Sequence, residues 1–150
     1  MNMPMHQKSA AKENSITKDY IQGMENKILL DTNAILRFLL DDLHGQYEMT
    51  KQAIEESDCI LILPVVQEAV YVLEGYYNVP RDRIVQSFID LKDAVMIEDE
   101  DVCLKAFEYY TEQPKLDFAD CILCGYHSVR KIDVLTFDRK LRKKMEGKSE

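Results

Sequence analysis

The sequence predicts an α/β fold in which helices cover both faces of a parallel β-sheet, as a three-layer α/β/α sandwich. One observation indicates this class, and two more indicate a single packed domain without a membrane span. Short apolar runs alternate with longer segments of helical periodicity, as in strand–helix–strand units. Hydrophobic residues make up 46% of the 150 residues and charged residues 31%, which suits one packed domain. No apolar run approaches the roughly 18–20 residues that span a bilayer.

Four apolar runs are the expected strands. They are residues 27–31 (KILLD), 59–63 (CILIL), 94–97 (AVMI) and 133–137 (DVLTF). Runs this short and this apolar are typical of parallel strands that are buried on both faces.

Seven helices are expected between and after these strands. Their ranges are 33–40, 46–57, 64–77, 80–92, 99–111, 117–129 and 139–145. Pro64 and Pro80 begin two of them, at a position where the missing N–H matters little. Right-handed crossovers between parallel strands restrict the topology. In open parallel sheets the ligand site lies beyond the carboxyl ends of the strands.

The ends of the chain differ from its middle. Residues 1–26 contain Pro4 and scattered charges without sustained periodicity, so we expect a flexible arm, and a natural start at Met24 stays open. The domain would span residues 27–146, followed by a tail over 147–150. The polar start lacks the apolar centre of a secretory signal, from which we expect a cytoplasmic protein.

Cys121 and Cys124 form a C-x-x-C pair, which is also found in zinc and redox sites. Both lie in a strongly helical stretch, and Cys59 and Cys103 do not form a second pair of matching spacing. We therefore expect reduced cysteines with a structural role in the core.

The net charge of −8 argues against a protein that coats nucleic acid through a broad basic surface. It does not exclude an enzyme that holds a phosphate through a metal ion. A basic cluster does occur near the C-terminus, at Arg139, Lys140, Arg142, Lys143 and Lys144. We favour a solvated helix with cations near its C-terminal end over a rim that guides phosphates.

Carboxylates recur at the sheet edge where such folds build active sites. Asp31 ends the first expected strand, Glu68 lies early in the helix after the second, and Asp138 follows the fourth. Asp117 and Asp120 open the helix before the fourth strand. We therefore expect one acidic cluster.

Converging carboxylates need a neutralising partner. Two unit charges about 4 Å apart repel by roughly 4 kcal/mol at an effective dielectric near 20. Protonation or a bound cation must relieve this repulsion. All-oxygen ligands favour Mg²⁺ or Mn²⁺, which support hydrolysis of phosphodiesters.

Each acid also has a structural interpretation. Asp31 and Asp117 are suited to cap helices, and Asp138 to a turn before the last helix. Glu68 could be a solvated helix residue. Asp120 stands where a capping box prefers Glu or Gln, so it is the better ligand candidate of the Asp117–Asp120 pair.

Four segments of the sequence resemble the signature segments of PIN domains. They are LLDTN at 29–33, PVVQE at 64–68, LDFADCIL at 116–123 and LTFDRKL at 135–141. They occur in the family's order and cover roughly residues 27–145. The similarity is closest to the VapC-type toxins of toxin–antitoxin pairs.

This resemblance implies a Mg²⁺- or Mn²⁺-dependent ribonuclease with an RNA substrate. By position, Asp31, Glu68 and Asp120 would be the core metal ligands and Asp138 the fourth acid. Accessory roles would fall to Asp117, Thr136 and Asn33. The resemblance also implies a homodimer and an inhibitory protein antitoxin.

Two other functions compete with this one. An aspartyl-nucleophile phosphatase would need D-x-D, but the chain has Asp31-Thr32-Asn33. A catalytically silent PIN fold could serve as a binding module. Five tyrosines could stack bases, although we favour packing or dimerisation for them: Tyr71, Tyr76, Tyr77, Tyr109 and Tyr110.

Overall fold

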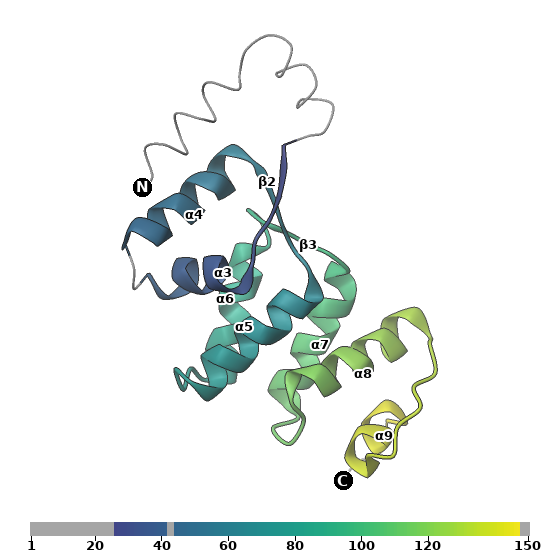
Figure 1. Ribbon diagram of the computed structural model, residues 1–150. Helices are drawn as coiled ribbons and strands as arrows, with labels where there is room; N and C mark the ends of the chain where they lie inside the picture. Colours follow the sequence, from purple (N-terminus) through teal and green to yellow (C-terminus); the bar gives the residue numbers. More distant parts are fainter. Residues whose placement is uncertain (1–25, 42–43, 148–150) are drawn as a thin grey trace. The chain divides into compact units, whose positions relative to one another are not determined.

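The computed structural model describes residues 26–41 and 44–147, so most of the expected N-terminal arm and C-terminal tail lies outside it. In the described part, seven helices and a three-stranded sheet follow one another along the chain (Figure 1). This arrangement confirms the α/β class. No helix among these residues combines the length and apolarity that crossing a membrane requires.

The observed elements lie within a few residues of the expected ones. The strands are β1 (Lys27–Leu29), β2 (Asp58–Leu61) and β3 (Met96–Ile97). The helices are α3 (Thr32–Leu40), α4 (His44–Glu56), α5 (Leu63–Gly75), α6 (Arg81–Leu91), α7 (Glu100–Glu112), α8 (Phe118–Arg130) and α9 (Arg139–Met145).

The sheet has the strand order β1-β2-β3, and β1 pairs with β2 in parallel. Ile28 lies opposite Cys59 in the register, and the N–H of Leu30 extends the pairing to the carbonyl of Ile60 at 3.0 Å. β1 is an edge strand, and all three of its residues are exposed, with Leu29 at 65%. The expectation of burial on both faces is therefore wrong for β1.

The expected fourth strand, residues 133–137, does not form in this structure. The segment is described, yet no strand of the described chain hydrogen-bonds to it. Leu135 and Phe137 are each 88% exposed. An apolar run becomes a strand only where a neighbouring backbone completes its hydrogen bonds, and here none does.

The chain divides into two compact units. The first extends to Leu61 and includes Ala94–Met96, and the second contains Ile62–Asp93 and the chain from Ile97 onward. In the first unit α3 packs against α4, with the rings of Phe38 and Tyr47 stacked at 5.4 Å between centroids. Burial of apolar side chains on α3 and β2 supplies the core of this unit.

The second unit is built around α7 and α8, which pack against each other along their lengths. Its core contains an aromatic cluster in which Phe107 lies 5.6 Å from Phe88 and 4.9 Å from Phe118 between ring centroids. Tyr110 meets Phe118 edge-on at 5.4 Å. These contacts fix the start of α8, because Phe118 is its first residue.

All four cysteines are buried and reduced, which confirms their structural role. Burial raises the pKa of the Cys121 thiol to about 12 and that of Cys124 to about 11. Thiols of such high pKa stay protonated at neutral pH and are poor metal ligands and nucleophiles. The C-x-x-C pair is therefore part of the helix packing.

Candidate functional site

Three of the predicted acids cap helices. In each, Oδ1 accepts a hydrogen bond from a backbone N–H two or three residues later: Asp31 from Ala34 (2.8 Å), Asp117 from Asp120 (2.8 Å), and Asp138 from Lys140 and Leu141 (2.9 and 3.2 Å). The capping interpretation is therefore right for Asp31 and Asp117, and Asp138, which was interpreted as a turn residue, is also a cap. Capping does not exclude a second role, because the cap bonds use only one of the two carboxylate oxygens.

Asp120 lies in the first turn of α8 and is half-buried. Its pKa is raised above the ordinary value, first by burial and then by the charge of Asp117. A hydrogen bond between these two carboxyl groups and the charge of Asp138 raise it further, while a backbone hydrogen bond from Asp117 opposes the shift. The structure thus brings Asp117, Asp120 and Asp138 into electrostatic contact.

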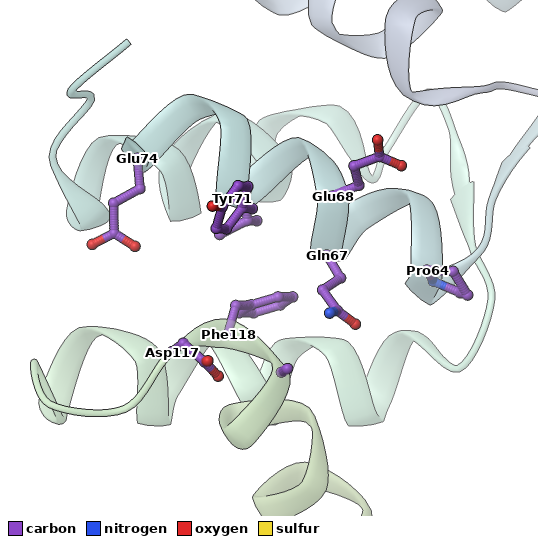
Figure 2. A pocket seen from close by; sticks show the side chains of 9 residues that line it. Pro64, Gln67, Glu68, Tyr71, Glu74, Asp117 and Phe118 are labelled. Carbon is purple, nitrogen blue, oxygen red and sulfur yellow. The ribbon is translucent and has the colours of Figure 1, made fainter. Parts of the chain in front are cut away.

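Glu68 lies on the exposed side of α5, in the second unit with these three acids. Figure 2 shows its carboxylate extending away from Asp117. The Glu68 and Asp117 carboxylates thus point in different directions, although both residues line one cavity. Asp31 and Asn33 belong to the first unit, where Asn33 is exposed on α3.

Thr136 positions Asp138 at the start of α9. Its hydroxyl oxygen accepts a hydrogen bond from the Asp138 backbone N–H at 3.0 Å. The Arg142 guanidinium donates to the Thr136 carbonyl at 2.7 Å and holds the same turn. Arg142 therefore has a structural contact, while Arg139 and Lys140 of the basic cluster are exposed.

The donor chemistry of the acids fits a hard divalent cation. Asp117, Asp120 and Asp138 offer carboxylate oxygens only, which Mg²⁺ and Mn²⁺ prefer. Burial and then the neighbouring charge of Asp117 raise the pKa of Asp120, and a bound cation would favour its charged form. Across residues 26–41 and 44–147, however, no three Asp, Glu, His or Cys side chains are grouped closely enough to hold a metal ion.

A cavity of about 390 Å³ lies beside this group, between α5 and α8 of the second unit (Figure 2). Val70 and Phe118 are its buried apolar residues, and Tyr71 and Gln67 are exposed on α5. Its full lining is Pro64, Gln67, Glu68, Val70, Tyr71, Glu74, Asp117, Phe118 and Ala119. The cavity is therefore lined by an exposed aromatic ring, an amide group and carboxylates around an apolar base.

Arg81 at the start of α6 organises the loop that leads into α8. Its Nε donates to Glu74 Oε2 at 2.8 Å, and the hydroxyl of Tyr110 donates to Glu74 Oε1 at 2.7 Å. Nη1 of Arg81 lies within hydrogen-bonding distance of the carbonyl oxygens of Tyr110 (2.9 Å), Gln113 (3.3 Å) and Leu116 (2.8 Å). One guanidinium thus binds the C-terminal carbonyls of α7 and the loop that follows.

Sequence reasoning missed this network. Leu116, which Arg81 holds, directly precedes the Asp117 cap and the Asp120 turn, so the guanidinium fixes the entry to the acidic group. The Arg81–Leu116 contact joins the first residue of α6 to a loop residue 35 positions later in the sequence. No local motif signals such a contact; the nearest hint is the pairing of opposite charges on both sides of the α5–α6 turn.

Comparison with known proteins identifies one family. Residues 28–146, well over half of the chain, match the family described as PIN domain. No curated protein and no solved structure matches the chain. The match confirms the resemblance at the level of the family, while the closer likeness to VapC-type toxins stays a prediction.

Proposed function

Since the chain belongs to the PIN-domain family, we propose that it is a Mg²⁺- or Mn²⁺-dependent endoribonuclease that hydrolyses RNA phosphodiester bonds. The observation that carries the proposal is the electrostatic contact of Asp117, Asp120 and Asp138 at the starts of α8 and α9. In a family that commonly consists of nucleases, a half-buried acid with a raised pKa is a candidate for the active centre.

The roles follow from chemistry and position. Asp120 would be the central ligand, with Asp31, Glu68 and Asp138 completing the acidic set. When bound, the cation would activate water and stabilise charge on the phosphate. Asp117 and Thr136 would orient their neighbours through the cap and turn hydrogen bonds, and Asn33 would be a polar neighbour of Asp31.

The biological setting that we propose is that of a VapC-type toxin. It would act in the cytoplasm as a homodimer and be inhibited by a protein antitoxin. This part rests on the four signature segments and on the family match. A short neighbouring reading frame that encodes a DNA-binding protein would support it, and purification of the chain in complex with that protein would test it directly.

Asp120→Asn tests the enzymatic proposal. It keeps the size of the side chain and removes one anionic oxygen ligand, so cleavage of a labelled RNA should fall by orders of magnitude and Mn²⁺ should bind more weakly. Stability in chelator should not fall, because relief of repulsion offsets any lost hydrogen bond of about 1 kcal/mol.

Asp117→Asn is the matched control for this experiment. Asn is a good N-cap, so the fold should be kept and activity should fall less than in Asp120→Asn. Cleavage at the wild-type rate in Asp120→Asn would remove this residue from the active centre.

The second candidate is a catalytically silent PIN fold that serves as a binding module. It is favoured by one observation, the absence of a three-ligand group among the described side chains. Calorimetric titration with Mn²⁺ separates the two candidates. A nuclease should bind the ion at a site that Asp120→Asn weakens, whereas a silent module should show neither this binding nor cleavage.

A further inference from the structure

The cavity between α5 and α8 includes two polar side chains, Tyr71 and Gln67, that the acidic site does not use. Tyr71 is 78% exposed although its aromatic ring is large and apolar. Figure 2 shows Tyr71 and Gln67 directed from α5 toward α8, on the side where Phe118 lies. An exposed ring beside a cavity, with an amide next to it, presents both a flat apolar surface and a hydrogen-bonding group.

The base of the cavity is formed by buried, closely packed side chains. Phe118 is buried against Phe107 and Tyr110, with ring centroids 4.9 and 5.4 Å away. Val70 is also buried. A ligand that enters would therefore meet a preformed apolar surface, which reduces the loss of side-chain freedom on binding.

The charge of the lining selects the class of ligand. None of the residues around the cavity is a lysine or arginine, so the cavity is poorly suited to a phosphate. The Glu74 carboxylate is already bound by Arg81 and by the hydroxyl of Tyr110. The lining also includes the Gln67 amide and the carboxylates of Glu68 and Asp117, whose oxygens can accept hydrogen bonds from N–H groups at the edge of a flat, uncharged ligand.

We propose that this cavity binds one nucleobase of single-stranded RNA, stacked on Tyr71 with its edge toward the Gln67 amide. The volume of about 390 Å³ lies at the lower end of the roughly 300–1,000 Å³ typical of small-ligand sites and suits a single nucleoside. Stacking on aromatic rings and edge contacts from amides are the usual means of recognising unpaired bases. The choice of RNA as the ligand rests on the function proposed above.

The position of the cavity connects base binding to catalysis. Asp117 lines the cavity and also caps the helix that carries Asp120. A base held between α5 and α8 would place the adjoining stretch of RNA beside the start of α8. Tyr71 and Gln67 would thus be specificity-determining residues rather than catalytic ones.

A fluorescent substitution tests the stacking. The chain contains no tryptophan, so Tyr71→Trp introduces a single indole at the cavity. We would combine it with Asp120→Asn to prevent cleavage and titrate it with a ten-nucleotide single-stranded RNA. Stacking should quench the indole emission in a saturable way. Tyr76→Trp is the matched control, because Tyr76 is similarly exposed at 76% and is not part of the lining.

Affinity measurements on the same Asp120→Asn background complete the test. Tyr71→Ala should weaken binding of the RNA by about 10- to 100-fold, since stacking of one base is worth roughly 1–3 kcal/mol. Tyr71→Phe should retain most of the affinity, and Tyr76→Ala should leave it unchanged. An affinity for RNA that Tyr71→Ala does not alter would overturn the proposal.

Sedimentation of the same variants tests the alternative that a second copy of the chain covers this face. If Tyr71→Ala converts a dimer to a monomer and leaves RNA binding intact, the face is a protein interface and the base site is overturned. Failure of the base site can also be distinguished from failure of the nuclease proposal. Quenching of the indole in the Tyr71→Trp variant without cleavage by the wild type would retain the base site and reject the nuclease, and cleavage without quenching would do the reverse.

Discussion

At the scale of single residues, three acids that we propose for the site also cap helices. Asp31 and Asp117 were predicted from the sequence both as caps and as site residues, and their caps are confirmed; Asp138, predicted as a turn residue and a site residue, is also a cap. Local spacing suffices to predict a cap, because donor and acceptor are within three residues. It cannot reveal that the charge of Asp138 raises the pKa of Asp120, since that contact depends on how α8 and α9 pack.

The raised pKa of Asp120 predicts a pH dependence of stability in chelator. Because the folded-state pKa exceeds the ordinary value of 3.8, the folded state binds the proton more readily than the unfolded chain. Wild type should therefore gain stability relative to Asp120→Asn as pH falls from neutral through the raised pKa. The gain in stability should be complete at pH values below the ordinary pKa of Asp120. Urea unfolding of both proteins at a series of pH values measures this difference.

Asp101 provides an internal contrast in the same titration. A hydrogen bond from Arg130 lowers the pKa of this exposed carboxyl. The stability that Asp101 contributes is fully present above its ordinary pKa and is lost as the pH falls through its lowered pKa. This range lies below the pH range in which Asp120 titrates. A difference between wild type and Asp120→Asn that is flat from neutral pH to below the ordinary carboxyl pKa would contradict the raised pKa of Asp120.

At the scale of elements, the sequence predicted every observed helix to within a few residues. Proline at the start of α5, acids at the starts of α7 and α8 and apolar periodicity were sufficient signals. The contacts that hold these helices together could not be predicted from the sequence. Arg81 joins α6 to the end of α7, and nothing in the local sequence specifies which carbonyls it reaches.

Arg81→Lys should destabilise the second unit and loosen the entry to α8. Lysine lacks the planar fork that binds Glu74 and three carbonyl oxygens at once, so we expect a loss of about 1.5–3 kcal/mol. The metal-dependent cleavage that we propose should also fall at temperatures where the variant is fully folded. Urea unfolding and cleavage rates measure the two effects. Arg83→Lys is the control, because Arg83 is exposed on the same helix and should tolerate the change.

Gly125→Ala tests the close approach of α7 and α8. A Cβ atom at this position would lie 2.7 Å from the backbone oxygen of Val102, so the helices would have to separate. Alanine favours a helix over glycine by about 1 kcal/mol, yet overpacking should outweigh this and leave a net loss of about 1–2 kcal/mol.

Gly75→Ala is the matched control for that substitution. Gly75 ends α5, and a Cβ atom there would meet nothing within 4 Å. We expect this variant to be neutral or slightly stabilised, in the range of about 0–1 kcal/mol. Thermal unfolding of both variants gives the comparison, and equal effects would mean that α7 and α8 are not in close contact at Gly125.

At the scale of the whole molecule, three of four expected strands form. The runs that became β1, β2 and β3 have partners along the sheet, and the run at 133–137 has none in the described chain. Apolar composition predicts which segments are able to form strands. Pairing depends on residues far away in the sequence, so the number of strands is a property of the complete fold.

A double substitution, Leu135→Ser with Phe137→Ser, tests this difference between sequence and structure. Both side chains are 88% exposed, so the free energy of unfolding should change by no more than about 1 kcal/mol in total. Leu141→Ser is the control on the helix that follows, because Leu141 is buried and its replacement should lose roughly 2–5 kcal/mol. Urea unfolding measures all three proteins under one condition. A loss in the double variant as large as that in Leu141→Ser would show that residues 133–137 are buried in a sheet, as the apolar pattern alone predicts.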